Sequence, residues 1–402
     1  MSKDEKIVHV FLNLSSPKVK VGILAYQNGK IFFEYDHEFL KTSLELSPYM
    51  LPLQEKVFEF NDSASDGLWG IFNDSIPNSL EQLVLDKYLK EQDINPLDIT
   101  PLDRLCYIGD FTMGALSYEC KQNYNNTIVK ELDQITRNVI VKDNETDLIK
   151  LFSSNNSLSS EVDHKVPIQH HNSRLTIGSI LKPLQQNFSQ VFVKFMSPTD
   201  PAELGKIEYA YSLMAKDAKL ERPHSYLIKN KYFAYKRFDY HENKRLHIHS
   251  VAGLIHSDIK NPTLDYNDLL ALSLDLTKDI RELEKVFRVA CFNLFSSNRD
   301  DHAKNFSFMM DENGIWKFAP SYNITFSNGL NGEHCTKYLG EGKNPTEKHL
   351  IELGSKHMLK NSKKIIKEVK ASISKWSMFA EKVNLSDETC NLILGEIYKK
   401  LN

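Results

Sequence analysis

The fold of this chain is decided by two neighbouring stretches of its second half, Asn298-Arg299-Asp300-Asp301-His302-Ala303-Lys304-Asn305 and Ala319-Pro320-Ser321-Tyr322-Asn323. A predicted β-hairpin separates the two stretches, with strands over Phe306–Met310 and Ile315–Phe318 joined by Asp311-Glu312-Asn313-Gly314. A hairpin carries the chain out and back again. We therefore expect it to return Tyr322 and Asn323 to a position close to Asn305.

An Asp followed by four residues and then an Asn is the spacing of the catalytic loop of protein kinases. In that loop the Asp orients the acceptor hydroxyl group and the Asn holds a magnesium ion. Asp300 and Asn305 have this spacing here, but Asn323 stands where a kinase has its second metal-binding carboxylate. A phosphotransferase also needs a cation for the phosphates. Lys194, on a predicted strand, fits this role, with Glu208 on the following helix as its predicted ion-pair partner.

Other interpretations of the same residues stay open. The cluster of Asp300, Asp301 and His302 could hold a divalent metal in a hydrolase or nuclease, although no second cluster with metal-site spacing is evident. His302 fits a structural hydrogen-bonding role as well as a nucleotide contact. The basic run over 360–370 could be a nucleic-acid face, but a charge run on a helix is usually a solvated surface.

The composition limits the possible fold and function but does not select one. The 402 residues can bury a sizeable core in two or more lobes. Because 50 Lys and Arg nearly balance 53 Asp and Glu, any nucleic-acid contact must be local or made through a partner. The five cysteines show no metal-finger spacing and are expected to be reduced, mostly buried thiols. Without an apolar signal core or a membrane-length apolar run, a cytoplasmic location and no membrane contact are expected.

The periodicity along the chain predicts an α+β fold with a strand-rich front, a mixed middle and a helical back. The corresponding domains are a strand-rich N-terminal subdomain over 1–120, a nucleotide-binding remainder of the N-lobe over 121–235 and a helical C-lobe over 236–402. Apolar alternation and turn signals predict strands over 8–14, 19–25, 31–35, 108–116, 190–195 and 232–239. Helical spacing predicts helices over 80–90, 202–218, 266–298 and 346–402. The polar stretch 121–174 is the least regular part and is expected to form helix fragments and a mobile loop between two lobes.

Several ordered motifs resemble those of the HipA-type serine/threonine kinases, toxins of bacterial toxin–antitoxin pairs, over nearly the whole chain. In the front these are Gly67-Leu68-Trp69-Gly70-Ile71-Phe72-Asn73-Asp74-Ser75-Ile76-Pro77, Ile108-Gly109-Asp110 and Met113-Gly114-Ala115. In the back they are Lys236-Arg237-Phe238-Asp239, Arg245-Leu246-His247, the stretch from Asn298 to Ser307 and the stretch from Ala319 to Thr325. The resemblance implies a kinase-like, two-lobed HipA fold.

The resemblance also implies a role for each matching position. Asp300 is the implied catalytic base, and Asn305 and Asn323 are the implied magnesium ligands. Nucleotide contacts are implied for Lys194 at the phosphates, for the backbone of Lys236, Arg237 and Phe238 at the adenine, and for His302, Lys304 and Tyr322. The implied cofactors are ATP and Mg. The implied partners are a small DNA-binding HipB-like antitoxin, operator DNA through that antitoxin only, and a protein substrate such as an aminoacyl-tRNA synthetase.

Two departures from the family pattern bear on activity. Asn323 replaces an Asp, and an amide oxygen brings no negative charge to a hard cation. The phosphate-covering loop aligns with Pro167-Ile168-Gln169-His170-His171-Asn172-Ser173-Arg174, which has no glycine to let backbone amides approach phosphate closely. Arg174 could replace the family lysine there. Some family members are autophosphorylated on a serine near this loop, for which Ser159, Ser160 and Ser173 are the candidates.

Two functions therefore compete on the sequence alone. The first is an ATP- and magnesium-dependent serine/threonine protein kinase of the toxin type. The alternative is a catalytically weak or dead pseudokinase that serves as the antitoxin-binding corepressor subunit, motivated by the two departures.

Overall fold

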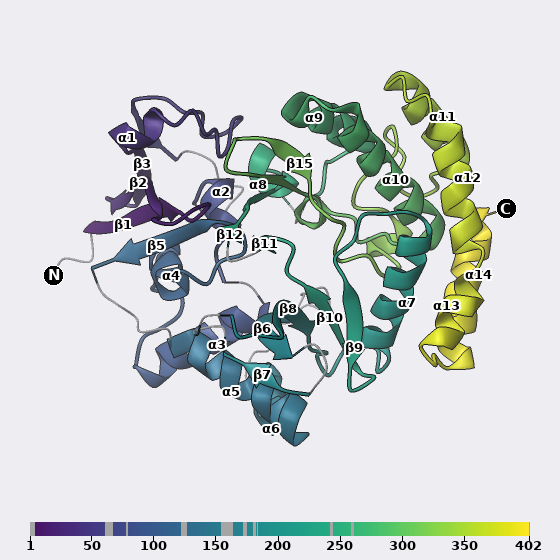
Figure 1. The fold of residues 1–402 in the computed structure, drawn as a ribbon, viewed down its shortest axis with the longest axis horizontal. Helices are drawn as coiled ribbons and strands as arrows, with labels where there is room; N and C mark the ends of the chain where they lie inside the picture. Colours follow the sequence, from purple (N-terminus) through teal and green to yellow (C-terminus); the bar gives the residue numbers. More distant parts are fainter. Residues whose placement is uncertain are drawn as a thin grey trace. The chain divides into compact units, whose positions relative to one another are not determined.

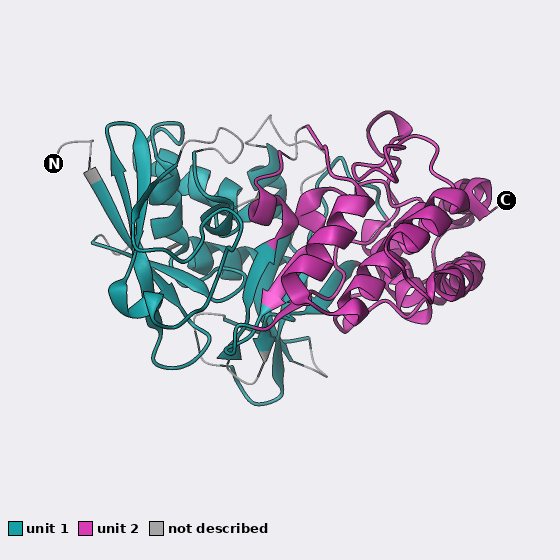
Figure 2. Cartoon of the chain, turned by 90° about the horizontal axis from the view of Figure 1, so that it is seen from above, with its two compact units in different colours: residues 1–202, 232–249, 310–314 teal, residues 203–231, 250–309, 315–402 magenta. Residues whose placement is uncertain are grey.

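The computed structural model describes residues 5–60, 67–77, 79–121, 127–153, 164–171, 175–179, 182, 184–241, 244–258 and 261–401. The chain divides into two compact units, coloured separately in Figure 2. Unit 1 comprises Met1–Ala202, Tyr232–His249 and Met310–Gly314. Unit 2 comprises Glu203–Lys231, Ser250–Met309 and Ile315–Asn402. Sheets dominate the first unit and helices the second, so the predicted α+β fold is confirmed (Figure 1).

Unit 1 begins with an antiparallel sheet in the order β4-β3-β2-β1-β5. Its first hairpin turns at Asn28-Gly29, where both residues have positive φ (52° and 79°), the geometry of the tight turns that join twisted strands. The Asn-Gly pair had predicted this turn from the sequence. The strands of the sheet are β1 (Glu5–Leu12), β2 (Val19–Gln27), β3 (Lys30–Tyr35), β4 (Val57–Glu59) and β5 (Leu116–Cys120).

Short helices separate the strands of this sheet. They are α1 (His37–Leu40), α2 (Gly70–Asn73), α3 (Ser79–Glu91) and α4 (Pro101–Ile108). The strand expected over 108–116 is wrong in its bounds, because β5 begins only at Leu116. Thr100 and Asp103 form a capping box with Pro101 at the first position, which starts a helix, and Gly109 ends it with φ 55°.

A second group of strands in unit 1 has the order β7-β6-β8-β10. These are β6 (Lys165–His171), β7 (Ile177–Gly178), β8 (Phe188–Lys194) and β10 (Tyr232–Lys236). The helices α5 (Thr127–Lys142) and α6 (Thr146–Ser153) lie beside them with α3 (Figure 1). The helix fragments expected in 121–174 are present as α5 and α6, whereas the strand β6 was not expected. Apolar residues at helical spacing, such as Ile128, Leu132 and Ile135, are buried on α5 and drive that helix.

Unit 2 is built around α10 (Ile280–Ser296), a helix with buried residues on most of its faces. It is contacted by α9 (Tyr266–Thr277), α11 (Glu347–Lys356), α12 (Ser362–Ile373) and α14 (Asp387–Leu401). The single helix expected over 266–298 is two helices, because Lys278 adopts a left-handed conformation (φ 54°) and Asp279 caps the second helix through the Arg281 amide.

The other elements of the chain are short apart from α7, which contacts α12 and α13. In unit 2 they are α7 (Leu204–Asp217), β9 (Ser225–Ile228), α8 (Val251–Ile255), η1 (Ala303–Asn305), β14 (Ser307–Met310), β15 (Trp316–Phe318), η2 (Leu330–Gly332) and α13 (Trp376–Lys382). The remaining strands are β11 (Tyr240–His241), β12 (Lys244–Arg245) and β13 (His247–Ser250).

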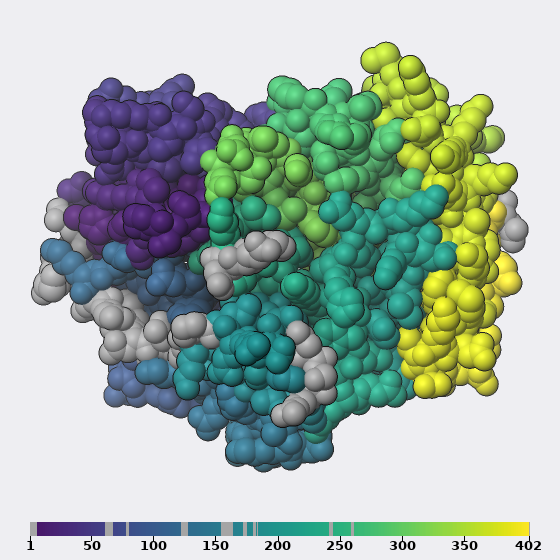
Figure 3. Space-filling view, in the orientation of Figure 1, coloured from purple at the N-terminus to yellow at the C-terminus, as the bar shows by residue number. Residues whose placement is uncertain are grey.

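The C-terminal helices α11 to α14 form one continuous surface, shown yellow in Figure 3. The basic run lies here. Lys363, Lys364 and Lys367 on α12 are exposed, and Lys370 forms an ion pair with Glu347 at 2.7 Å. This is the solvated helix face that a charge run usually makes. In the described part of the chain, no helix is both long enough and apolar enough to cross a membrane.

The cysteines differ from the expectation of reduced thiols throughout. Cys106 at the end of α4 and Cys120 at the end of β5 form a disulfide bond, while Cys291, Cys335 and Cys390 take no part in a disulfide. The two bonded residues are separated by 14 positions, and no local sequence pattern indicated that the chain brings them together. The bond closes the loop that carries Gly109 to Ala115.

Replacing Cys106 and Cys120 together by Ser is expected to lower the stability of unit 1 by about 2–4 kcal/mol, because the cross-link reduces the entropy of the unfolded chain. The measurement is the denaturant midpoint of the unreduced protein. Cys390→Ser makes the same chemical change at a half-buried free thiol and serves as the control. A double variant that unfolds at the same midpoint as Cys390→Ser would contradict the stabilising role.

Candidate active site

The Asp300 loop, residues 298–305, starts where α10 ends. Ser297 terminates the helix in a left-handed conformation (φ 56°), and the Asn298 amide still donates to the Asn293 carbonyl at 3.0 Å. This cap turns the chain out of the helix core at a fixed point. The loop then passes through Asp300 to η1, which ends at Asn305. The buried helix therefore sets the position at which the loop begins.

Asp300 and Asn305 are joined through the loop itself. The Asn305 side-chain amide donates to the Asp300 carbonyl at 2.7 Å, which closes the turn from residue 300 to residue 305. The Asp300 carboxylate is about one-third exposed, and its Oδ1 lies 3.8 Å from His302 Nε2. His302 Nε2 is also 3.4 Å from the Asn305 amide nitrogen. The loop thus presents a carboxylate, an imidazole and an amide side by side.

The hairpin returns the second stretch to the Asp300 loop, as the sequence predicted. Strands β14 and β15 are neighbours in their sheet, and Asn323 Nδ2 donates to Asn305 Oδ1 at 3.0 Å. The Tyr322 hydroxyl donates to the Lys304 carbonyl at 2.8 Å and accepts from Ser307 at 2.5 Å. The Tyr322 hydroxyl is therefore engaged in closing the loop against the hairpin.

The oxygens of Asn305 and Asn323 are the predicted magnesium ligands, and their surroundings can be compared with that role. Asn323 Oδ1 is buried without a hydrogen-bond partner among the described residues, as expected of an oxygen that a ligand completes. Both residues line a cavity of about 10 Å³ together with Asn298 and Asp301. The two amides fit a cation that arrives with phosphate oxygens. They supply no charge, and metal binding would compete with their mutual hydrogen bond.

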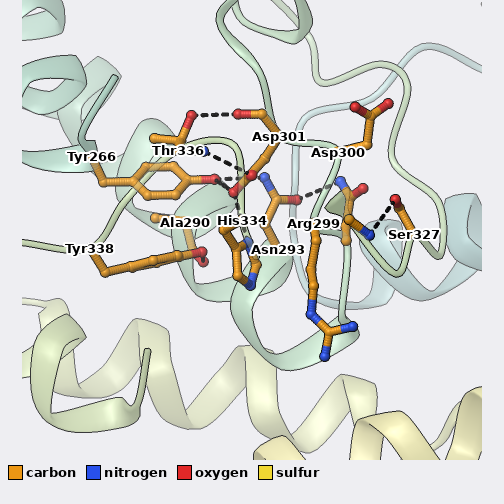
Figure 4. A network of polar contacts seen from close by, with 12 residues as sticks. Tyr266, Ala290, Asn293, Arg299, Asp300, Asp301, Ser327, His334, Thr336 and Tyr338 are labelled. Carbon is orange, nitrogen blue, oxygen red and sulfur yellow. Dashed lines mark hydrogen bonds and ion pairs between the residues drawn. The ribbon is translucent and has the colours of Figure 1, made fainter. Parts of the chain in front are cut away.

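Asp301 faces the opposite way from Asp300, into the core of unit 2 (Figure 4). Its Oδ2 accepts from the Tyr266 hydroxyl at 2.9 Å and from His334 Nδ1 at 3.0 Å, and its Oδ1 accepts from the Thr336 amide at 3.1 Å. Burial, and then the nearby Asp301 carboxylate, raise the pKa of Tyr266 well above its usual value. The Tyr266 hydroxyl therefore keeps its hydrogen and donates it.

This arrangement does not support a metal-dependent hydrolase. Asp301 is committed to hydrogen-bond donors inside the core, so it cannot share a cation with Asp300 and His302. Among the residues that the structure describes, no group of three or more His, Cys, Asp or Glu side chains is placed to hold a metal ion.

The other predicted nucleotide residues are divided between the units. Lys194 ends β8 of unit 1, opposite Lys165 of β6, and is half-buried. Glu208 is a buried residue of α7 in unit 2, so its ion pair with Lys194 stays a prediction. Arg174 lies outside the described residues, as do the candidate serines Ser159, Ser160 and Ser173.

The stretch aligned with the phosphate loop is largely a strand. Pro167 to His171 belong to β6, which pairs with β8 along its whole length and with β7 at Gln169 and His170. His170 is buried, and this burial lowers the pKa of its imidazole, with the neighbouring His171 adding to the effect. The β6 residues are paired on both sides and cannot cradle a phosphate as a flexible loop would, and residues 172–174 lie outside the described part of the chain.

The segment predicted to meet the adenine, Lys236 to Phe238, begins at the last residue of β10. The Arg237 amide donates to the Gln190 carbonyl at 2.9 Å, while the Arg237 side chain is buried against Asp239 with an Nε to Oδ1 distance of 3.0 Å. Burial raises the pKa of Asp239. The ion pair with Arg237 outweighs this effect and holds the pKa of Asp239 below its usual value. Burial and the adjacent Arg237 lower the pKa of Arg245 to about 10.

The Arg237 guanidinium is therefore a structural group, and the side chain of Arg237 is not available to a ligand. It donates to the Thr112 carbonyl at 3.1 Å, and the Gly114 amide donates to Asp239 at 2.8 Å. Thr112 and Gly114 lie in the loop that the Cys106–Cys120 disulfide closes. The disulfide loop thus holds the buried ion pair beside the predicted adenine segment.

A serine, a histidine and an aspartate in unit 1 have the hydrogen-bond order of an acyl-transfer triad. Ser47 Oγ lies 3.0 Å from His249 Nε2, and His249 Nδ1 lies 2.7 Å from Asp74 Oδ2. However, Ser47 is only 1% exposed, and His249 is fully buried. A catalytic serine must be reachable by its substrate. These side chains therefore connect distant segments of unit 1 and do not form a hydrolase site.

The sequence did not identify the residues around Asp301 as a group. Tyr266, Asn293, His334 and Thr336 are separated from it by up to 35 positions. The only sequence signal was the second Asp of the pair Asp300-Asp301, which has no place in the spacing of the kinase loop.

A buried helix that leads into an Asp-to-Asn loop, with a hairpin returning to that loop, is the arrangement of a kinase-like protein. Family models identify the class more narrowly. Residues 12–119 match the HipA N-terminal domain, and residues 161–377 match the HipA-like C-terminal domain. The second match alone covers more than half of the chain, so the chain belongs to the HipA family. This confirms the resemblance seen in the sequence.

A solved structure of a HipA complex supports this fold. A chain of the Shewanella oneidensis MR-1 toxin–antitoxin complex of HipA, HipB and operator DNA is similar over 98% of this chain and 96% of its own length. The TM-score is 0.69 at 14% sequence identity, a likeness of fold. The Helicobacter pylori proinflammatory kinase CtkA matches 54% of this chain and 87% of its own, with 14% identity and a TM-score of 0.35. No curated protein matches the sequence.

Proposed function

We propose that this chain is an ATP-dependent serine/threonine protein kinase that acts as the toxin of a toxin–antitoxin pair. Membership of the HipA family supports the class of toxin kinase and, with it, the use of ATP. The observation that carries the proposal is the contact of 3.0 Å between Asn305 and Asn323 beside the partly exposed Asp300 carboxylate. This contact joins the two stretches that a kinase needs in one place.

In this proposal Asp300 orients the acceptor hydroxyl and takes its proton as the oxygen attacks the γ-phosphorus and ADP leaves. Asn305 and Asn323 would hold Mg²⁺ through their amide oxygens, and that ion would neutralise charge on the phosphates. The partly exposed state of the Asp300 carboxylate supports its role, because an acceptor hydroxyl must reach it.

The remaining nucleotide contacts follow from the family pattern. We assign the phosphates to Lys194, paired with Glu208, and to Arg174, and the adenine to the backbone of Lys236–Phe238. His302, Lys304, Tyr322 and the Asp300 loop would line the nucleotide. The protein substrate would be a cellular protein of the aminoacyl-tRNA synthetase kind, and the partner a small HipB-like antitoxin through which operator DNA is met. The S. oneidensis complex with HipB and operator DNA supports that partnership.

A second function is favoured by one specific observation. The Asn323 amide donates to Asn305 Oδ1, a hydrogen bond that an ionised Asp at position 323 could not donate. A site that closes on itself in this way would bind magnesium weakly. A chain of this kind could act only as the corepressor subunit that binds the antitoxin.

Asp300→Ala is expected to abolish phosphate transfer from ATP to protein while leaving ATP binding intact, because the loop is closed by the Asp300 carbonyl, which accepts from Asn305 and stays in the variant. Transfer is measured with ATP labelled at the γ-phosphate, and binding by the rise in thermal stability on titration with ATP and Mg²⁺. The thermal titration separates a dead enzyme from an unfolded one. Absence of nucleotide binding by the wild type at every metal concentration would contradict the proposal.

Asn323→Asp is expected to raise the transfer rate at least about tenfold, because a carboxylate holds Mg²⁺ more strongly than an amide. This corresponds to an activation barrier lowered by roughly 1.4 kcal/mol. The backbone at Asn323 has φ 49°, a conformation that Asp also tolerates, so the change is compatible with the fold. Asn344→Asp adds the same charge at an exposed site of unit 2 and is the control. Binding of the antitoxin without transfer in either form of residue 323 would favour the corepressor function.

A further inference from the structure

The buried Asp301 carboxylate is the end point of a one-way chain of hydrogen-bond donors in unit 2 (Figure 4). Asn298 donates to Asn293 at 2.9 Å, Asn293 donates to the Tyr266 hydroxyl at 2.8 Å, and Tyr266 donates to Asp301 at 2.9 Å. An ionised carboxylate only accepts hydrogen bonds, so every donor can point toward it. The direction of the whole network therefore depends on the carboxylate at position 301.

The same carboxylate also accepts hydrogen bonds from residues 327–338, the segment that follows the metal-binding stretch. His334 Nδ1 and the Thr336 amide donate to its two oxygens, and the Thr336 hydroxyl donates to the Asp301 carbonyl. Thr336 and His334 are both buried, with exposures of 0% and 4%.

Backbone contacts complete the attachment of the 327–338 segment to the Asp300 loop. The Ser327 amide donates to the Ser297 carbonyl at 3.1 Å, and the Cys335 amide donates to the Arg299 carbonyl at 3.1 Å. The Arg299 guanidinium donates to the Asn328 carbonyl at 3.3 Å and to Glu396 of α14 at 3.2 Å. The segment is thereby bound on both sides of Asp300.

In many protein kinases, the segment after the metal-binding stretch is ordered only when a phosphate group is added to it and pairs with arginine. Here the Asp301 carboxylate, in the Asp300 loop, supplies a negative charge without any modification. Thr336 is committed by its hydroxyl to the core, so it cannot be phosphorylated without breaking these contacts. The segment has the means to remain ordered without modification.

We infer that Asp301 is a positioning residue that fixes the 327–338 segment and the orientation of Asp300, so that the site is assembled without phosphorylation of that segment. Asp301 touches no reacting atom in this account. It acts through the backbone that it shares with Asp300, whose side chain points the opposite way (Figure 4). The kinetic part of this inference rests on the proposed kinase function, whereas the structural part does not.

The test is Asp301→Asn, which keeps the size of the side chain but replaces one acceptor oxygen by a donor that faces Tyr266, His334 or Thr336. Hydrogen exchange of the amides of residues 334–338 should become at least tenfold faster. For phosphate transfer, kcat should fall at least tenfold while KM for ATP changes less than threefold. Phosphatase treatment of the wild type should leave both constants unchanged.

The matched control is Glu282→Gln. Glu282 is another buried carboxylate of unit 2 that accepts from a backbone amide, that of Phe318 at 2.9 Å, but it does not touch the 327–338 segment. This variant should lose stability without faster exchange at residues 334–338. Unchanged exchange in Asp301→Asn, or loss of transfer after phosphatase treatment, would overturn the inference. If the wild type shows no transfer at all, the proposed function fails, and the exchange data still decide the role of Asp301.

Discussion

The structure of the site depends on one buried charge, the Asp301 carboxylate. Taking an ionised carboxylate out of water is costly unless hydrogen bonds replace its hydration. Here the replacement comes from Tyr266 on α9, from His334 and from Thr336, so the cost can be met only when these segments come together. The same requirement that satisfies the charge also fixes the path of the chain on either side of Asp300.

Two adjacent carboxylates thereby receive two different roles from their surroundings. Asp301 is enclosed by donors and is inert. Asp300 is about one-third exposed and holds its place through its own carbonyl, which accepts from Asn305, so its carboxylate stays available for chemistry. A loop whose backbone is held by buried contacts can present a reactive group with little freedom to move, which is what catalysis by positioning requires.

The parts of this fold that the sequence predicts correctly are those set by local signals. Asn28-Gly29 requires positive φ at both residues and so identified the first hairpin, and the 306–318 hairpin predicted that Asn323 returns to Asn305. The capping box at Thr100 is also a local signal, and it predicts a helix that runs into the start of the strand expected over 108–116. The partners of Asp301 and the Cys106–Cys120 bond arise from contacts between distant segments, for which one sequence contains no spacing rule.

Asn323 departs from the HipA family pattern at a residue that is predicted to bind magnesium. Its side-chain nitrogen donates to Asn305, whereas its side-chain oxygen is buried without a hydrogen-bond partner among the described residues, as expected of an oxygen that binds a ligand. The most direct measurement is a crystal structure of the protein with Mg²⁺ and an ATP analogue that cannot transfer its γ-phosphate. The account predicts that the γ-phosphate lies beside the Asp300 carboxylate, with the Asn305 and Asn323 amides facing it. A nucleotide bound away from the Asp300 loop would contradict the account.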